Sequence, residues 1–146
     1  MRTILVAALL LLAPAARAEL GGAPLSDAAA ARGLAAVRAG ETGGGGCTVH
    51  HLVTAAGAVR EFARPDGTVF AVAWEGHAPP DLAAVLGAYA AEVKAAFPLR
   101  ARAPGRGAEV RSANVILQTW GHMRALHGRA WVPALVPAEV NLDDVR

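Results

Sequence analysis

The hydrophobic pattern is clearest over residues 68–74, where both faces of an alternating strand are apolar. Thr68, Phe70, Val72 and Trp74 share one face, and Val69, Ala71 and Ala73 share the other. A strand that is apolar on both faces is expected inside a sheet. A turn is expected immediately before it, at Pro65-Asp66-Gly67. Proline presets φ, the aspartate side chain can accept a hydrogen bond from nearby backbone, and glycine tolerates positive φ. We therefore predict a strand over 68–75.

Two more strands are predicted before this one, over 48–54 and 59–63, with Ala56-Gly57 as the connection between them. Connections this short force antiparallel neighbours, so the three strands should form a meander. A single amphipathic helix is predicted over 81–97, with Pro80 and Asp81 at its start and Pro98 at its end. Its apolar stripe consists of Leu82, Val85, Leu86, Tyr89, Val93 and Phe97. At this spacing the stripe should pack on the sheet and close the core.

The last third of the chain predicts short antiparallel strands and turns. The strands are expected over 110–112, 115–119 and 122–126, with turns at Ser112-Ala113-Asn114 and Trp120-Gly121. Gly128-Arg129 should break the chain before an extended stretch over 130–135, and Asn141 should cap a helical turn in the tail. The predicted fold class is α+β: a meander of three antiparallel strands, one amphipathic helix packed on the sheet, then two to four further short antiparallel strands.

The sequence of the N-terminal region predicts a cleaved signal peptide and then a leader before the folded domain. Residues 1–18 have the features of a signal peptide, with Arg2, an apolar run and the Ala16-Arg17-Ala18 cleavage pattern. Residues 19–46 are rich in Ala and Gly and predict a flexible leader, and residues 47–146 predict a single α+β domain. No later segment is apolar for long enough to span a membrane. We therefore expect export to the periplasm or the medium.

Charge and cysteine content narrow the possible partners, which the sequence does not identify. Removing the signal peptide would leave twelve Lys and Arg against twelve Asp and Glu, so the basic pI of the precursor does not indicate a nucleic-acid partner. The only cysteine, Cys47, cannot form an internal disulfide. It is expected either to be a buried thiol or to join two chains as a homodimer.

The sequence selects no catalytic, cofactor-binding or metal-binding residues. His50 and His51 are adjacent on a predicted strand and should point to opposite faces, so both cannot bind one ion. Neither Ser26 nor Ser112 stands in a nucleophile motif. The densest group of polar and aromatic side chains is a candidate patch for an anionic or sugar-like ligand, formed by His122, Arg124, Trp74, Trp120, Arg129 and Trp131. The alternative role for these residues is structural, with tryptophans sealing the sheet edges.

Four stretches together resemble a family of exported proteobacterial proteins catalogued as domain of unknown function 2844. They are 20–24 (LGGAP), 59–74 with its VREF and GTVFAVAW segments, 80–89 with its PDL and LGAY segments, and 121–146 with its GHMRA and GRA segments. The resemblance implies export and one compact domain. It carries no established activity, and so no catalytic residue.

Two classes of function remain open from the sequence. The first is a non-enzymatic exported module that binds a ligand or partner or serves in the cell envelope. The second is a small hydrolase or metal-dependent enzyme that would use His122, Arg124 and a carboxylate.

Overall fold

The computed structural model describes residues 20–24, 36–42, 44–97 and 107–145. The predicted signal peptide over 1–18 lies outside this range, as does the part of the predicted leader over 25–35. Within the described residues, none of the helices has the length and apolar character needed to cross a membrane.

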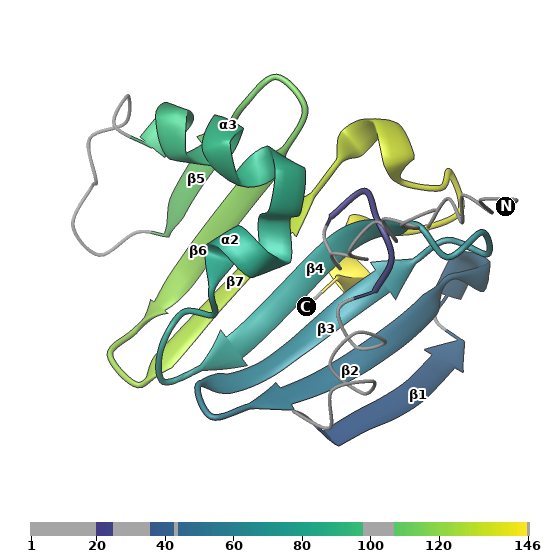
Figure 1. Ribbon diagram of the computed structural model, residues 1–146, viewed down its shortest axis with the longest axis horizontal. Helices are drawn as coiled ribbons and strands as arrows, with labels where there is room; N and C mark the ends of the chain where they lie inside the picture. Colours follow the sequence, from purple (N-terminus) through teal and green to yellow (C-terminus); the bar gives the residue numbers. More distant parts are fainter. Residues whose placement is uncertain (1–19, 25–35, 43, 98–106, 146) are drawn as a thin grey trace, which may run out of the picture.

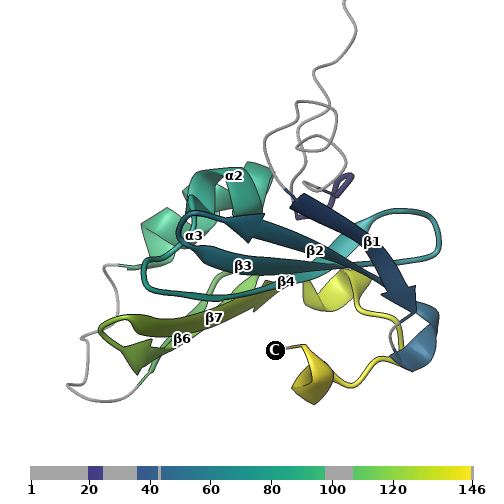
Figure 2. The ribbon, with the colours of Figure 1, turned by 90° about the horizontal axis from the view of Figure 1, so that it is seen from below.

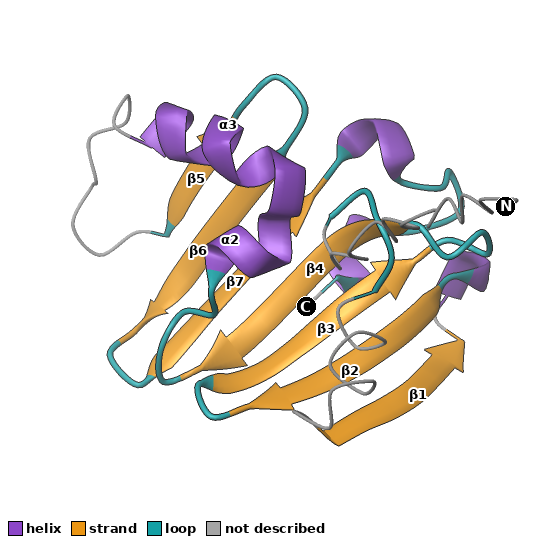
Figure 3. Ribbon diagram, in the orientation of Figure 1, coloured by secondary structure: helices purple, strands orange, loops and turns teal. Residues whose placement is uncertain are grey.

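The fold is built on a seven-stranded sheet in which every neighbouring pair is antiparallel (Figures 1 and 3). The strands are β1 (Ala36–Thr42), β2 (Thr48–Thr54), β3 (Gly57–Ala63), β4 (Val69–Gly76), β5 (Ala108–Arg111), β6 (Ile116–His122) and β7 (Ala125–Trp131). Their spatial order is β1-β2-β3-β4-β7-β6-β5. Two runs of sequential hairpins therefore meet where β4 pairs with β7.

The predicted three-strand meander is confirmed as β2, β3 and β4. The turn between β3 and β4 works as its residues predict: the Gly67 N–H donates to the Arg64 carbonyl at 2.8 Å, and the Thr68 N–H donates to Asp66 Oδ1 at 2.9 Å. The hydrogen bond from Thr68 also lowers the pKa of Asp66 below its ordinary value. Local turn chemistry therefore determines this hairpin.

The shared face predicted for Phe70, Val72 and Trp74 is wrong for Phe70. The register shifts between Phe62 and Ala63, which pair with Ala71 and Val69, so Phe70 is the extra residue of a β-bulge. Phe70 consequently lies with Ala71 and Ala73 in one buried cluster, while Val72 and Trp74 belong to the cluster on the other side of the sheet.

Part of the segment predicted as a leader forms a strand of the sheet. Residues 36–42 form β1, which pairs with β2 along the edge of the sheet. Leu20 is only 1% exposed, and the Gly21 N–H donates to the Val69 carbonyl at 2.8 Å. The sequence of β1, AVRAGET, contains Val37 and Thr42 but otherwise residues with low strand propensity, so pairing with the free edge of β2 decides its conformation.

The helical segment is broken, although its start is as predicted. Asp81 caps α2 (Leu82–Leu86) by accepting from the Ala83 N–H at 3.0 Å. A 3₁₀ turn, η2 (Gly87–Tyr89), then leads into α3 (Ala90–Ala96). The predicted continuous helix is wrong because Gly87 adopts φ 52° and ψ −123°, a conformation that glycine favours and that no α-helix contains.

Both faces of the sheet are covered, by different parts of the chain. Figures 1 and 2 show α2 and α3 on one side and the C-terminal tail on the other. On the helix side Val85, Leu86 and Val93 join strand residues such as Leu52 and Trp74 in one cluster. The tail contributes Val145 to the second cluster, and its last 3₁₀ turn, η5 (Leu142–Asp144), is capped by Asn141 as predicted.

The last hairpin and the chain after it differ from prediction. β6 continues through His122, the loop is Met123-Arg124, and β7 starts at Ala125. The predicted turn at Trp120-Gly121 and break at Gly128 are therefore wrong, because both glycines lie inside strands. After β7, a 3₁₀ turn, η4 (Pro133–Leu135), replaces the predicted extended stretch.

Glu92 connects α3 to the β5–β6 turn. The Asn114 N–H donates to Glu92 Oε1 at 2.8 Å, and the Asn114 side-chain amide donates to Oε2 at 3.1 Å. Hydrogen bonds from the Ser112 hydroxyl and then from Asn114 lower the pKa of Glu92 below its ordinary value of 4.5. Because the Glu92 carboxyl group binds a proton more readily in the unfolded chain than in the folded one, ionised Glu92 stabilises the fold at pH values above 4.5. This stabilisation is lost as the pH falls through the lowered pKa.

We expect Glu92→Gln to make the acid dependence of stability shallower. For wild type, the urea concentration at the midpoint of unfolding should decrease as the pH is lowered from about 5 to about 3. For the variant, this concentration should decrease less over the same pH range. Glu139→Gln, at an exposed position of the tail, is the matched control and should follow the wild-type curve. Parallel curves for wild type and Glu92→Gln would contradict the assignment.

Candidate functional site

A group of polar and aromatic side chains lies on the tail side of the sheet, next to the part that the tail covers. We call it the polar face, and it consists of Arg60, Glu75, Gln118, Trp120, His127 and Arg129. These residues come from β3, β4, β6 and β7. The register places them in two neighbouring rows across the sheet, because directly paired residues project to the same side.

The first row runs from Glu75 through His127 to Trp120. Glu75 pairs with His127, and His127 pairs with Trp120. The Trp120 and His127 rings are stacked, with 5.9 Å between centroids and 9° between planes. Glu75 Oε2 lies 4.0 Å from His127 Nδ1 and 3.8 Å from Arg60 Nη2. Together with Arg60 beside it, the row therefore combines aromatic surface with a carboxylate, an imidazole and a guanidinium group.

The second row is organised by Arg129. Its Nε donates to Gln118 Oε1 at 2.8 Å, and its Nη1 donates to the Leu142 carbonyl at 2.6 Å and to the Val145 carbonyl at 3.4 Å. The guanidinium carbon lies 5.3 Å from the Trp131 ring centroid and 6.0 Å from that of Trp120. Arg129 thus anchors the tail to the sheet and borders the aromatic row.

The candidate patch predicted from the sequence is only partly assembled. Trp120, Arg129 and Trp131 lie together on the tail side. Trp74 is 4% exposed and lies in the cluster under the helices, on the opposite side of the sheet. His122 and Arg124 lie at the end of the β6–β7 hairpin.

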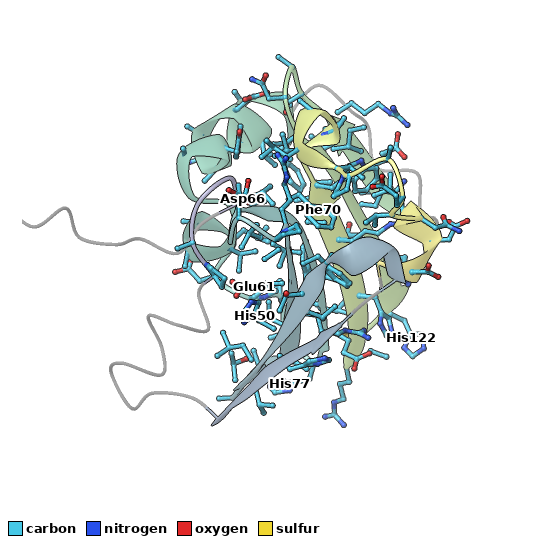
Figure 4. The ribbon with its side chains drawn as sticks, turned by 90° about the vertical axis from the view of Figure 1, so that its right-hand side faces the viewer. His50, Glu61, Asp66, Phe70, His77 and His122 are labelled. Carbon is cyan, nitrogen blue, oxygen red and sulfur yellow. The ribbon has the colours of Figure 1, made fainter. Side chains whose placement is uncertain are left out.

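The predicted shared strand face of His122 and Arg124 is wrong, because Arg124 belongs to the hairpin loop and has φ 69°. His122 Nδ1 lies 3.2 Å from the Met123 carbonyl, and Figure 4 shows His122 well away from Glu61 and Asp66. Among the interactions of the described residues, none joins His122 or Arg124 to a carboxylate. The geometry therefore gives no support to the enzyme that these two residues would have formed.

Glu75, His127, Gln118 and Arg60 were missed by the sequence patch. For His127 and Gln118, the signal that could have found them is the register of the last hairpin. A loop at Met123-Arg124 places His127 opposite Trp120 and Arg129 opposite Gln118. Prediction of the turn at Trp120-Gly121 concealed both pairs.

The histidines at the start of the sheet and the cysteine are also possible metal ligands by residue type. His50 pairs with Glu61, and Figure 4 shows these two residues side by side. His51 pairs with Arg60, so the two adjacent histidines point to opposite faces as predicted. In the described part of the chain, no three His, Cys, Asp or Glu side chains are grouped to hold a metal ion. Cys47 is 3% exposed, and burial raises the pKa of its thiol. Such a thiol cannot reach a second chain without local opening.

The fold and the polar face define a small α+β protein whose antiparallel sheet carries a solvent-exposed polar and aromatic surface. The chain belongs to the family described as "Protein of unknown function (DUF2844)", whose model matches residues 16–145. The resemblance seen in the sequence is therefore confirmed. No curated protein and no solved structure matches the chain.

Proposed function

We propose that the protein is an exported, non-enzymatic binding module that holds a sugar-like ligand on its polar face. The observation that carries the proposal is the row Glu75–His127–Trp120, in which stacked rings stand next to hydrogen-bonding groups. Ligand sites typically combine aromatic surface with a few polar groups that fix orientation. Export rests on the signal features of residues 1–18 and is tested by finding Glu19 as the first residue of the secreted protein.

The charges of the polar face favour a neutral polyhydroxyl ligand over an anion. Arg60 faces Glu75, so this cation already has a carboxylate beside it. Two of the Arg129 nitrogens donate to Gln118 and to the tail carbonyls. An anion would also be repelled by the Glu75 carboxylate, which lies within 4.0 Å of both Arg60 and His127. Hydroxyl groups, by contrast, can both donate to Glu75 and accept from Arg60 and His127.

Binding is better supported than catalysis at this face. The Glu75 and His127 side chains are 51% and 39% exposed, and the 4.0 Å between them exceeds hydrogen-bond distance. General acid–base catalysis requires groups positioned within hydrogen-bond distance of the proton they transfer. Electrostatic stabilisation of a transition state is strongest where water is excluded. An open, hydrated row instead suits reversible recognition.

Trp120→Ala is expected to weaken ligand binding by at least about tenfold, because stacking on this ring supplies apolar contact that polar groups do not. An array of neutral and anionic oligosaccharides would identify the ligand, and titration of the best hit would give its Kd. Met123→Ala is the matched control, since Met123 is 90% exposed on the same hairpin but outside the polar face. Unchanged binding in Trp120→Ala, or a purely anionic set of hits, would refute the proposed site.

A further inference from the structure

The helix layer, which lies on the side of the sheet opposite the polar face (Figure 2), carries a concave feature of its own. As the described residues outline it, this is an apolar groove of about 310 Å³. Its lining consists of Leu82, Ala83, Leu86, Ala90, Ala91, Val93, Lys94 and Phe97. We call it the helix groove. Its volume is at the lower end of the range of small-molecule sites, about 300–1,000 Å³.

Residues on both sides of the break at Gly87 line the helix groove. Because Gly87 leaves the helical conformation, α2 and α3 meet at a bend (Figure 1), and residues of both helices line one hollow. Leu86 and Val93 form a buried floor within the main core cluster, so the floor is held in place by the sheet. Ala83 and Ala91 lie on the exposed parts of the wall, where their small side chains leave space.

Among the described residues, Lys94 is the only charged one that lines the helix groove, and it is the only lysine in the sequence. It is exposed, so its stem can lie along apolar surface while the ammonium group stays in water. An apolar hollow with one cation at its rim is complementary to an alkyl chain that ends in an anionic group.

We propose that the helix groove binds a single-chain anionic amphiphile, with its hydrocarbon chain on Leu86 and Val93 and its carboxylate beside Lys94. The proposal is independent of the sugar site, which lies on the other side of the sheet. A stable complex with a second copy would bury at least about 1,000 Å² in total, far more than this hollow offers, so one slender chain fits it better. Each methylene group that enters the groove should tighten binding about fourfold.

The test uses saturated fatty acids from octanoate to tetradecanoate, below the concentrations at which they form micelles, with affinity measured by calorimetry. Affinity should rise with chain length and then level off when the groove is full. Dodecanoate should bind at least about tenfold more tightly than dodecyltrimethylammonium, because only the anion is attracted to Lys94. Absence of saturable dodecanoate binding, or equal affinity for the two head groups, would overturn the proposal.

Variants of α3 provide matched controls. Ala91→Phe fills the groove and should weaken dodecanoate binding by at least about tenfold, whereas Ala95→Phe, on an exposed position of α3 outside the lining, should not. Lys94→Glu should reverse the head-group preference. Trp120→Ala should leave dodecanoate binding unchanged, which separates this site from the polar face. Equal effects of Ala91→Phe and Ala95→Phe would also reject the groove as the binding site.

Discussion

Replacing Gly128 by alanine is expected to lower the free energy of unfolding by about 3 kcal/mol. A Cβ atom at this position would lie 2.2 Å from Cζ2 and 2.4 Å from Cε2 of the Trp74 indole. Trp74 is 4% exposed and packed in the core under the helices, so the ring has little room to withdraw. Urea denaturation of wild type and variant would measure the difference.

The matched control for Gly128→Ala is the double variant Trp74→Phe/Gly128→Ala. Trp74→Phe alone should be destabilising because it leaves a cavity, but the smaller ring should accept the new methyl group. The two substitutions should therefore cost less together than the sum of their separate effects. Additive effects, or a Gly128→Ala protein within about 0.5 kcal/mol of wild type, would contradict this account.

Truncation after Asn141 is expected to destabilise the protein by about 3–5 kcal/mol. It removes Val145, which is fully buried against the tail-side cluster, and burial of such a side chain contributes about 1.5–3 kcal/mol. It also removes the two carbonyls that accept from Arg129, and hydrogen bonds to a charged group contribute about 1.5–3 kcal/mol. Urea denaturation should show the loss, and binding of a hydrophobic dye should show newly exposed surface around Phe70.

Arg129→Met separates the two parts of this effect, because it keeps the tail and an apolar side chain but removes the donors. We expect a loss of about 1–2 kcal/mol from this variant. Arg64→Met is the matched control: the Arg64 side chain is 40% exposed and lies 3.8 Å from the Asp66 carboxylate in the same turn, so its removal should change stability by less than about 0.5 kcal/mol. A truncated protein as stable as wild type would show that the tail does not stabilise the buried cluster on its side of the sheet.

The predictable parts of this fold are those that neighbouring residues determine. Asp66 and Gly67 form the turn between β3 and β4, Asp81 caps α2, and Asn141 caps the last 3₁₀ turn. Each is a hydrogen bond between positions a few residues apart, so the sequence is sufficient to predict it. β1 depends instead on a free edge of β2, and its own residues do not indicate a strand.

The candidate site was harder to predict because it depends on register. A shift of one residue moves a side chain to the other face of a sheet. Trp74 was grouped with Trp131, but Trp74 pairs with Gly128 while Trp131 pairs with Ala71, and the two rings lie on opposite sides. No local pattern reveals that Gly128 is there to make room for the indole.

Both ends of the described chain pack against the start of β4, from opposite sides of the sheet. The Val69 N–H donates to the Gly22 carbonyl at 2.9 Å, while Val145 packs in the cluster that contains Phe70. The core is thus completed by contacts between residues far apart in sequence, which are the slowest to form. On the ribosome, the tail-side cluster therefore cannot be completed until Val145 has emerged, so this face of the core closes only after β4 and its neighbours have been made.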